Sequence, residues 1–269
     1  MPFLPRQALV TGVSAGLGRA FAEKLRAEGV EVWGTARDVA RVPAGIRPLA
    51  LDLGDAASVA ACIRQAHAEA PALDLLVNNA GAGAFFALED FPEDDLERQW
   101  RVLLHGPAAL TRGFYGAFRS RRRGMVVNVT SLAGDYPIPF MSAYSGAKAG
   151  LSAFTRTLML EAEGSGVTVV DLRPGDYATG FNDAMAGFRS VVRRDALAAR
   201  EACVAHVASG PKPDKAAADL WRAVRRGKSG VVCTGDVWQA GLGPLLARFA
   251  PEAVVRAYLK RYYGMKGDA

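Results

Sequence analysis

Three residues between positions 131 and 148 carry side chains that could perform acid–base chemistry together. They are the hydroxyl of Ser131, the phenol of Tyr144 and the amine of Lys148. Tyr144 and Lys148 lie in residues 143–164, where apolar residues recur with the period of a helix, so their side chains would share one helix face. Ser131 follows the β-branched run 125–130, which predicts a strand, and it would lie at the end of that strand.

This combination of groups suits proton transfer to and from an oxygen atom. A phenol has an unperturbed pKa of about 10, which makes it a poor base at neutral pH. A nearby ammonium group stabilises the phenolate, so Lys148 is expected to lower the pKa of Tyr144. Tyr144 could then give a proton to an alkoxide or take one from an alcohol, while the Ser131 hydroxyl holds the oxygen. If the chain also binds a dinucleotide, the chemistry becomes hydride transfer.

A glycine-rich turn near the N-terminus predicts a pyrophosphate site. Residues 7–11 have the pattern of a short apolar strand, residues 11–18 read TGVSAGLG, and residues 19–29 have the pattern of a helix. Glycines let the backbone approach phosphate groups, and the N-terminus of the helix offers free N–H groups and a positive dipole. The placement of the glycines between a strand and a helix makes this signal stronger than a glycine-rich run alone.

The end of the second predicted strand, residues 30–38, indicates which dinucleotide fits. This position reaches the adenosine ribose, and NAD-specific sites place a carboxylate there for the 2′-hydroxyl. Here Ala36 occupies the position and Arg37 follows it, and a guanidinium group suits a 2′-phosphate. The sequence therefore favours NADP(H), with NAD(H) as the alternative because Asp38 is adjacent.

The rest of the chain alternates between strand and helix patterns. Further strands are expected at residues 47–53, 73–78, 125–130, 166–175 and 230–235, and further helices at 56–70, 93–120 and 213–227. This alternation predicts an α/β fold of the Rossmann type, a doubly wound parallel sheet with helices on both faces in a single domain. The expected division is a mainly cofactor-binding half at 1–130, a catalytic and substrate half at 131–235 with a lid at about 176–213, and a C-terminal helical extension at 236–269.

In such a sheet the ligand lies at the carboxyl ends of the strands. The polar or turn-forming residues that fall just beyond those ends are Thr11, Ala36, Asp52, Asn78, Ser131 and Pro174. One crevice is therefore expected to collect all of these positions.

Four motifs resemble those of the short-chain dehydrogenase/reductase family. They are TGVSAGLG at 11–18, NNAG at 78–81, Ser131 with Tyr144-x-x-x-Lys148, and Pro174-Gly175 followed by Thr179. The resemblance runs from about Gln7 to Gly235, and the order and spacing of all four motifs make it specific. It implies an oxidoreductase that uses a nicotinamide dinucleotide.

The resemblance assigns roles to individual residues. Ser131 resembles the ligand of the substrate oxygen, Tyr144 the acid/base, and Lys148 the group that holds the nicotinamide ribose and perturbs Tyr144. The residues expected to bind the cofactor are Gly12, Ser14, Ala15, Gly16, Leu17, Gly18, Arg37, Asp52, Leu53, Asn79, Ala80, Gly81, Tyr144, Lys148, Pro174, Gly175 and Thr179.

Two positions depart from the family pattern. Leu103 stands where members often have an Asn that supports a water-linked proton relay to the Lys. Part of that support comes from the backbone carbonyl, which Leu retains, and Gln99 lies one helical turn earlier and could substitute. Ala15 stands where many NADP-using relatives have a basic residue, so the preference for the 2′-phosphate depends on Arg37.

Composition and charge exclude several other classes of protein. The 269 residues carry a net charge of +6, and the basic cluster Arg119, Arg121, Arg122 and Arg123 is interpreted as a solvated helix end, with nucleic-acid binding as the weaker alternative. The odd number of widely spaced cysteines and the three scattered histidines predict no disulfide framework and no metal site. We find no signal peptide and no apolar run that could span a bilayer, and we expect a cytoplasmic protein.

The segments around the predicted site indicate a bulky apolar substrate. The residues expected to form the pocket wall are Phe85, Phe86, Tyr136, Pro137, Phe140, Tyr177, Phe181, Met185 and Phe188. Such walls favour ketones or secondary alcohols of that character. The alternatives are a non-enzymatic dinucleotide-sensing regulator and a nucleotide-sugar epimerase or dehydratase on the same fold.

The C-terminal residues 251–264 predict one more helix, with Pro251 near its start and Gly264 at its end. Its apolar face is expected to dock on its own domain or on a partner copy in a homodimer or homotetramer. Attachment to a membrane surface is the less favoured interpretation.

Overall fold

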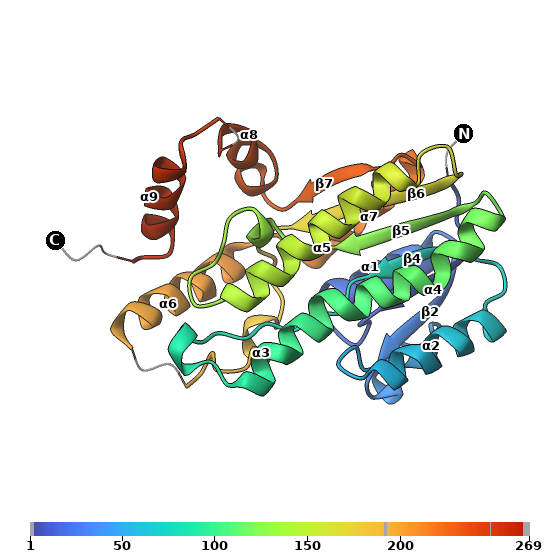
Figure 1. Cartoon of the computed structure of the whole chain (residues 1–269), viewed down its shortest axis with the longest axis horizontal. Coiled ribbons are helices and arrows are strands. Elements are labelled where there is room, and N and C mark those ends of the chain that lie inside the picture. The colour runs from blue at the N-terminus through green and yellow to red at the C-terminus, as the bar shows by residue number, and fades with distance from the viewer. Residues whose placement is uncertain (1–2, 191–192, 248, 266–269) are drawn as a thin grey trace.

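Seven parallel strands form one sheet in the order β3-β2-β1-β4-β5-β6-β7 (Figure 1). This is seen in a computed structural model that describes residues 3–190, 193–247 and 249–265. The strands are β1 (Gln7–Thr11), β2 (Glu31–Ala36), β3 (Arg47–Ala50), β4 (Leu73–Asn78), β5 (Gly124–Val129), β6 (Val167–Pro174) and β7 (Gly230–Thr234). The order reverses between β1 and β4, so a crevice opens at the carboxyl ends of these two strands. The predicted α/β sheet is confirmed.

Helices cover both faces of the sheet. One face carries α1 (Gly16–Ala27) and α7 (Pro213–Arg226), and the other carries α2 (Ala56–Glu69), α4 (Gly106–Ser120) and α5 (Ser142–Glu161). Successive strand residues point to opposite faces, so both faces of a covered strand must be apolar. In β1, for example, Ala8 and Val10 pack with α1 and α7, whereas Leu9 packs on the opposite side.

The long helix predicted at residues 93–120 is interrupted. It consists of α3 (Glu93–Trp100), a π-helical turn at Arg101–His105, and α4. Within the turn the N–H of Gly106 bonds to the carbonyl of Arg101, five residues earlier. An α-helix would pair the carbonyl of Leu103 with the N–H of residue 107, but Pro107 has no N–H. The proline therefore explains why regular α-helical bonding fails at this point.

The segment expected to form a lid contains regular structure in its described part. A short 3₁₀ turn at Asn182–Ala184 is followed by α6 (Arg194–Ser209), and residues 191–192 lie outside the described range. Ala186 forms an isolated bridge with Ala84, which fixes the start of this segment against the loop after β4.

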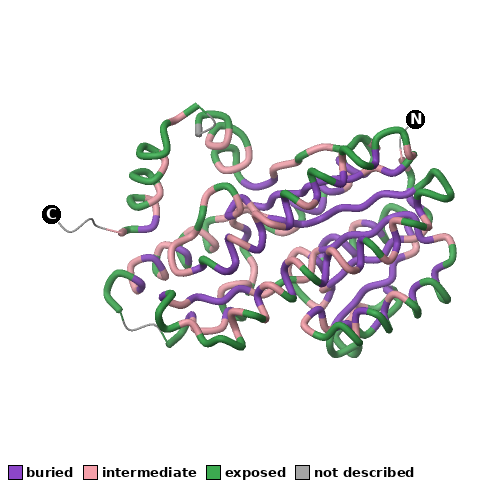
Figure 2. Tube along the Cα trace, viewed as in Figure 1, coloured by how far each residue is buried: buried purple, intermediate pink, exposed green. Residues whose placement is uncertain are grey.

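The C-terminal extension is helical, as predicted. It contains a π-helical turn at Trp238–Leu242, α8 (Gly243–Ala247) and α9 (Glu252–Tyr262). Figure 2 shows this extension largely exposed or half-buried, in contrast to the buried strands. Leu259, Tyr262 and Tyr263 of its last turns pack against the body of the same chain, while Val254 and Tyr258 of the expected apolar face stay exposed.

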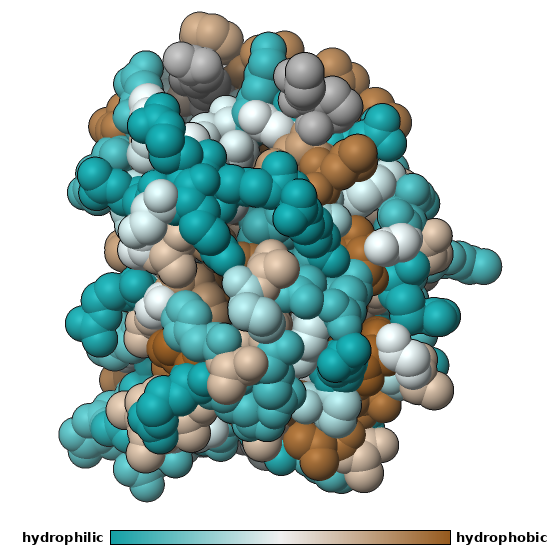
Figure 3. Space-filling view, turned by 90° about the vertical axis from the view of Figure 1, so that its right-hand side faces the viewer, coloured by the Kyte–Doolittle hydropathy of each residue, from teal (hydrophilic) through white to brown (hydrophobic). Residues whose placement is uncertain are grey.

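The end of the molecule that carries the N-termini of the strands is mainly hydrophilic (Figure 3). The basic cluster after α4 contributes structural contacts there and is not only a solvated helix end. Arg121 donates to the carbonyls of Pro71 and Leu73, and Arg123 pairs with the buried carboxylate of Asp74.

Candidate active site

A cavity of about 820 Å³ lies at the carboxyl ends of the strands. It brings together all the residues predicted for catalysis and cofactor binding: Gly12, Ser14, Ala15, Gly16, Leu17, Gly18, Arg37, Asp52, Leu53, Asn79, Ala80, Gly81, Ser131, Tyr144, Lys148, Pro174, Gly175 and Thr179. They come from the carboxyl ends of the strands and the loops that follow β1 to β6, and from the first turns of α1 and α5. A parallel sheet places these loops at one edge, which is why residues far apart in sequence meet.

The glycine turn packs so closely against its neighbours at Gly18 that no side chain fits there. A Cβ atom added to Gly18 would lie 2.1 Å from the carbonyl oxygen of Gly12 and 2.4 Å from Nδ2 of Asn79. Gly12 itself has a φ of +73°, which side chains disfavour. The hydroxyl of Thr11 accepts hydrogen bonds from the N–H groups of Asn79 and Ala80, each at 2.9 Å, and so joins this turn to the NNAG motif.

The start of α1 is a suitable anion site. The helix begins at Gly16, directly after the turn, and its first turn contains no acidic residue. The unpaired N–H groups and the positive end of the helix dipole therefore face the cavity without a competing carboxylate. This arrangement, together with the close backbone approach at Gly18, fits the pyrophosphate of a dinucleotide.

The charges at the end of β2 are compatible with the predicted role of Arg37, which is to bind a 2′-phosphate on the adenosine ribose. Arg37 lines the cavity, and so does Arg41, which sequence analysis missed. Asp38 is turned toward its own loop, where its Oδ1 accepts a 3.0 Å hydrogen bond from the N–H of Ala40 and caps a 3₁₀ turn. The spacing of four residues between Arg37 and Arg41 was the signal in the sequence that could have identified the second arginine.

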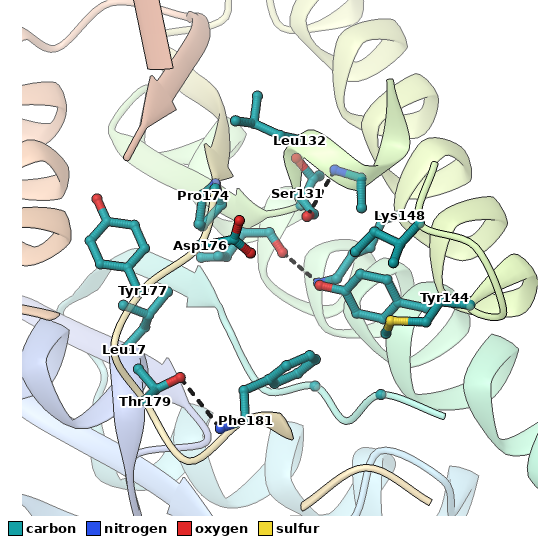
Figure 4. Close-up of a pocket in the computed structure, with 18 of the residues that line it drawn as sticks. Leu17, Ser131, Leu132, Tyr144, Lys148, Pro174, Asp176, Tyr177, Thr179 and Phe181 are labelled. Carbon is teal, nitrogen blue, oxygen red and sulfur yellow. Dashed lines mark hydrogen bonds between the residues drawn. The ribbon is translucent and has the colours of Figure 1, made fainter. Parts of the chain in front are cut away.

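Ser131, Tyr144 and Lys148 converge on one side of the cavity (Figure 4). Ser131 lies just beyond β5, and its Oγ accepts a 3.0 Å hydrogen bond from the N–H of Ala133. Tyr144 and Lys148 project from the first turns of α5, and Lys148 Nζ lies 5.9 Å from the centre of the Tyr144 ring. Nζ also donates a 2.8 Å hydrogen bond to the carbonyl of Val129, which holds the amine against the end of β5.

Burial controls the titration of the two ionisable groups. Desolvation raises the pKa of Tyr144 to about 12, against a smaller lowering by its hydrogen bond with Ser131. The expectation of a lowered pKa is therefore wrong, because burying a phenolate is costly and the net shift of the pKa is upward. Desolvation also lowers the pKa of Lys148 to about 8, and the charge of Asp171 opposes this shift.

The carboxylate of Asp171 is fully buried behind the lysine and is held from several directions. It accepts hydrogen bonds from Thr130 at 2.5 Å and from Ser152 and Arg173 at 2.8 Å each. Three donors hold this carboxylate in place, and its charge acts on Lys148 against the effect of burial.

Leu103 replaces the Asn that family members often have, and the polar side chain of Gln99 lies nearby. The Leu103 side chain is completely buried, and a Cβ atom added to Gly81 would lie 3.0 Å from Leu103 Cδ2 and 3.9 Å from Lys148 Nζ. Gln99, one turn earlier, lines the cavity and is buried, and its Oε1 has no hydrogen-bond partner among the described residues. The side chain at 103 therefore contributes packing, while Gln99 retains an unused acceptor.

The predicted substrate wall is partly wrong. Tyr136, Tyr177 and Phe181 do line the cavity. Phe85, Met185 and Phe188 instead belong to the core, where the rings of Phe85 and Phe188 meet edge-to-face at 5.3 Å. Most of the missing wall comes from the C-terminal extension, with Leu246, Val254, Val255, Tyr258, Leu259 and Tyr262. No pattern in the sequence indicated that the C-terminal extension would return to the loop after β6.

The fold and these motifs recur in known proteins. A family model for the short chain dehydrogenases matches residues 6–188. The chain belongs to this family of oxidoreductases. It is 32% identical over 179 residues to a 3-ketodihydrosphingosine reductase of Bacteroides thetaiotaomicron, a match that covers 66% of each chain and so just under two thirds of that relative. It is also 32% identical over 192 residues to a 3-oxoacyl-acyl-carrier-protein reductase of Salmonella typhimurium, covering 69% of this chain and 79% of that one.

Solved structures of the family extend the likeness over the whole chain. A short-chain dehydrogenase from Streptomyces avermitilis is 28% identical, with a TM-score of 0.79 and coverage of 97% of this chain and 96% of that one. A metagenomic short-chain oxidoreductase in complex with NADP is 27% identical, with a TM-score of 0.70 and coverage of 86% and 97%.

Two further classes of site were sought in the part of the chain that the structure describes. No helix there is long and apolar enough to cross a membrane. Among the same residues no group of three or more histidine, cysteine, aspartate and glutamate side chains could hold a metal ion.

Proposed function

We propose that this chain is an NADP(H)-dependent oxidoreductase that interconverts a ketone and a secondary alcohol on a bulky, fairly apolar substrate. The observation that carries the proposal is the shared cavity in which Ser131, Tyr144 and Lys148 lie beside a glycine turn too close-packed to accept a side chain at Gly18. Two relatives support it, because their names describe reduction of a 3-keto or 3-oxo group. One solved relative is a complex with NADP.

In this proposal the chain provides proton transfer and positioning. The bound nicotinamide supplies or accepts the hydride. The neutral phenol of Tyr144 holds a proton for the developing alkoxide, and the Ser131 hydroxyl donates a hydrogen bond to the same oxygen. The ammonium group of Lys148 supports both the ribose and the charge that forms on Tyr144. Burial raises the pKa of Tyr144, so its phenol carries the proton that reduction of a ketone requires.

The lining of the cavity also suits the proposed bulky, apolar substrate. The apolar and aromatic side chains of α9 and of the loop after β6 suit a large carbon skeleton. The cofactor half is assigned to residues 1–130 and the catalytic half to 131–235, with the extension 236–269 completing the substrate wall. A cytoplasmic homodimer or homotetramer is the proposed assembly.

The function is tested by following NADPH oxidation with a panel of ketones of increasing size. We expect turnover of bulky apolar ketones and poor turnover of acetone. A regulator would bind NADPH and turn over none of the panel. An epimerase or dehydratase would act on nucleotide sugars without net consumption of NADPH.

The preference between the two dinucleotides is expected to depend on Arg37. Replacing Arg37 by Ala removes a charge-assisted contact of about 1.5–3 kcal/mol, so NADPH should bind about tenfold to a hundredfold more weakly. NADH binding should change little, because NADH lacks the 2′-phosphate. Titration of both cofactors into wild type, Arg37→Ala and the exposed control Arg64→Ala measures this. Equal NADPH affinity in wild type and Arg37→Ala would show that Arg37 does not contact the cofactor.

Restoring the family's usual residue at position 103 is expected to change the rate by less than about tenfold, or 1.4 kcal/mol in the barrier. The substitution Leu103→Asn leaves the backbone carbonyl of residue 103 unchanged. Pro107 has no N–H to donate to this carbonyl in either protein. The thermal midpoint should fall, because a fully buried apolar side chain is replaced by an amide. Steady-state kinetics and thermal melts check both effects, and Gln99→Leu serves as the comparison. A rise of tenfold or more in kcat for Leu103→Asn would show that the natural relay is impaired.

A further inference from the structure

Asp176 is a carboxylate of the cavity to which the proposed reaction gives no role. It lies two residues beyond the end of β6, on the segment that faces Tyr144 (Figure 4). Its Oδ2 accepts a 2.6 Å hydrogen bond from Nε2 of Gln239 and a 3.4 Å hydrogen bond from the hydroxyl of Tyr262. The N–H of Asp176 donates back to Oε1 of Gln239 at 2.9 Å. The carboxylate is thus held in place by the C-terminal extension.

The negative charge of Asp176 has no counter-ion in the described structure. No lysine, arginine or histidine nitrogen among the described residues lies within 4.0 Å of it. The described cavity residues from 174 to 263 include no lysine or arginine. The one basic side chain there is His206, and burial lowers its pKa against the opposing effect of the Asp176 charge. A half-buried carboxylate that has hydrogen-bond donors but no cationic partner favours a bound cation.

Aromatic rings surround this charge on the side of the extension. The rings of Tyr262 and His206 stack at 3.9 Å, and those of Tyr262 and Tyr263 meet at 5.1 Å. Tyr258 stacks on Tyr262 at 5.8 Å. The ring of Tyr262 reaches the carboxylate through its hydroxyl and is stacked with His206 and Tyr258, so the attraction for an ammonium group comes from the charge of Asp176 beside this aromatic cluster.

We propose that Asp176 binds a protonated amine of the substrate, so that the enzyme acts on amphipathic amino ketones or amino alcohols. This deepens the proposed function and rests on it. The amine pairs with Oδ1, for which the structure shows no hydrogen bond, while Gln239 and Tyr262 occupy Oδ2. The carbonyl carbon lies toward Tyr144, and the apolar part of the substrate lies along Leu246, Val255 and Leu259.

The rival explanation is that Asp176 only fastens the C-terminal extension to the body of the protein. The two explanations differ in what they predict for a charged and a neutral ligand of the same length. A fastening residue would affect both ligands equally, because both need an intact wall. A binding residue for the amine would affect only the charged ligand.

Equilibrium titration with octylamine and octan-1-ol separates these explanations without requiring turnover. At pH 7, with and without NADP, wild type should bind octylamine at least about tenfold more tightly than octan-1-ol. Asp176→Asn keeps the shape and the acceptor for Gln239 but loses the charge, so it should lose this preference. Asp183→Asn, which removes an exposed carboxylate outside the cavity, should retain it. Gln239→Leu should also retain the preference, even where the affinity for both ligands falls.

Steady-state kinetics extend the test from binding to the reaction. Linear ketones that carry a terminal ammonium group are compared with methyl-terminated ketones of equal length. The ratio of the two kcat/KM values should fall about tenfold or more in Asp176→Asn. The inference is overturned if wild type shows no preference for the amine, or if Asp176→Asn weakens both ligands alike. If no ketone is turned over, the proposed function fails, and the binding preference is judged by titration alone.

Discussion

Tyr144→Phe is expected to lose nearly all turnover while it still binds NADPH. The substitution removes one hydroxyl, and with it the proton that the site delivers to the substrate oxygen. Positioned general acids contribute about a hundredfold to ten-thousandfold to the rate, and we expect a loss of that size in kcat. The ring remains, with its contact to Phe181 at 5.7 Å, so the cavity should keep its shape and its affinity for the cofactor.

Single-turnover kinetics and NADPH titration measure the two halves of this prediction. Tyr115→Phe is the matched control, because the Tyr115 hydroxyl is buried away from the cavity and has no partner among the described residues. It should turn over like wild type. A Tyr144→Phe protein with undiminished kcat would refute the assignment of Tyr144, whereas loss of NADPH binding would indicate a structural role.

Lys148→Met should remove activity without lowering stability. The pKa of Lys148 falls from its ordinary value of 10.5 to about 8 because the amine is buried. This shift corresponds to about 3 kcal/mol of destabilisation while the lysine is charged in both the folded and the unfolded state. Methionine has a similar volume and no charge. Removing the buried charge recovers the cost of burying the lysine. This gain offsets the loss of about 1–3 kcal/mol that arises when the Val129 carbonyl has no hydrogen-bond donor.

The effect on stability depends on pH with a definite sign. Below about pH 8 both the folded and the unfolded lysine carry a proton, and the full cost of burial is present. Between pH 8 and 10.5 the unfolded chain binds more protons than the folded chain, so the free energy of unfolding of the wild type rises with pH. The advantage in free energy of unfolding that Lys148→Met gains by removing the buried charge therefore disappears over this range. Denaturant unfolding at pH 7 and at pH 10 measures this, with the exposed Lys228→Met as the control. A variant that is much less stable at pH 7 would show that the lysine mainly supports the fold.

The sequence alone predicted the fold and the position of the glycine turn that lines the cavity. Each covered strand is apolar on both faces, as at Ala8, Leu9 and Val10, and this pattern arises when helices cover both sides of a parallel sheet. The order and spacing of TGVSAGLG, NNAG and Tyr144-x-x-x-Lys148 then located the crevice, because the carboxyl ends of parallel strands share one edge. These features are local in sequence or follow from topology, so no packing detail was needed.

Tertiary structure decided the titration of the site and the shape of the substrate wall. The pKa of Tyr144 depends on how deeply the phenol is buried, and desolvation proved larger than the expected effect of Lys148. Phe85 and Phe188 were predicted to face the substrate but pack in the core, because an apolar residue in a loop fits either place. The wall instead comes from α9, and Gln239 and Tyr262 meet Asp176 across more than sixty residues of chain. Contacts between such distant segments depend on how whole helices pack, which no local pattern encodes.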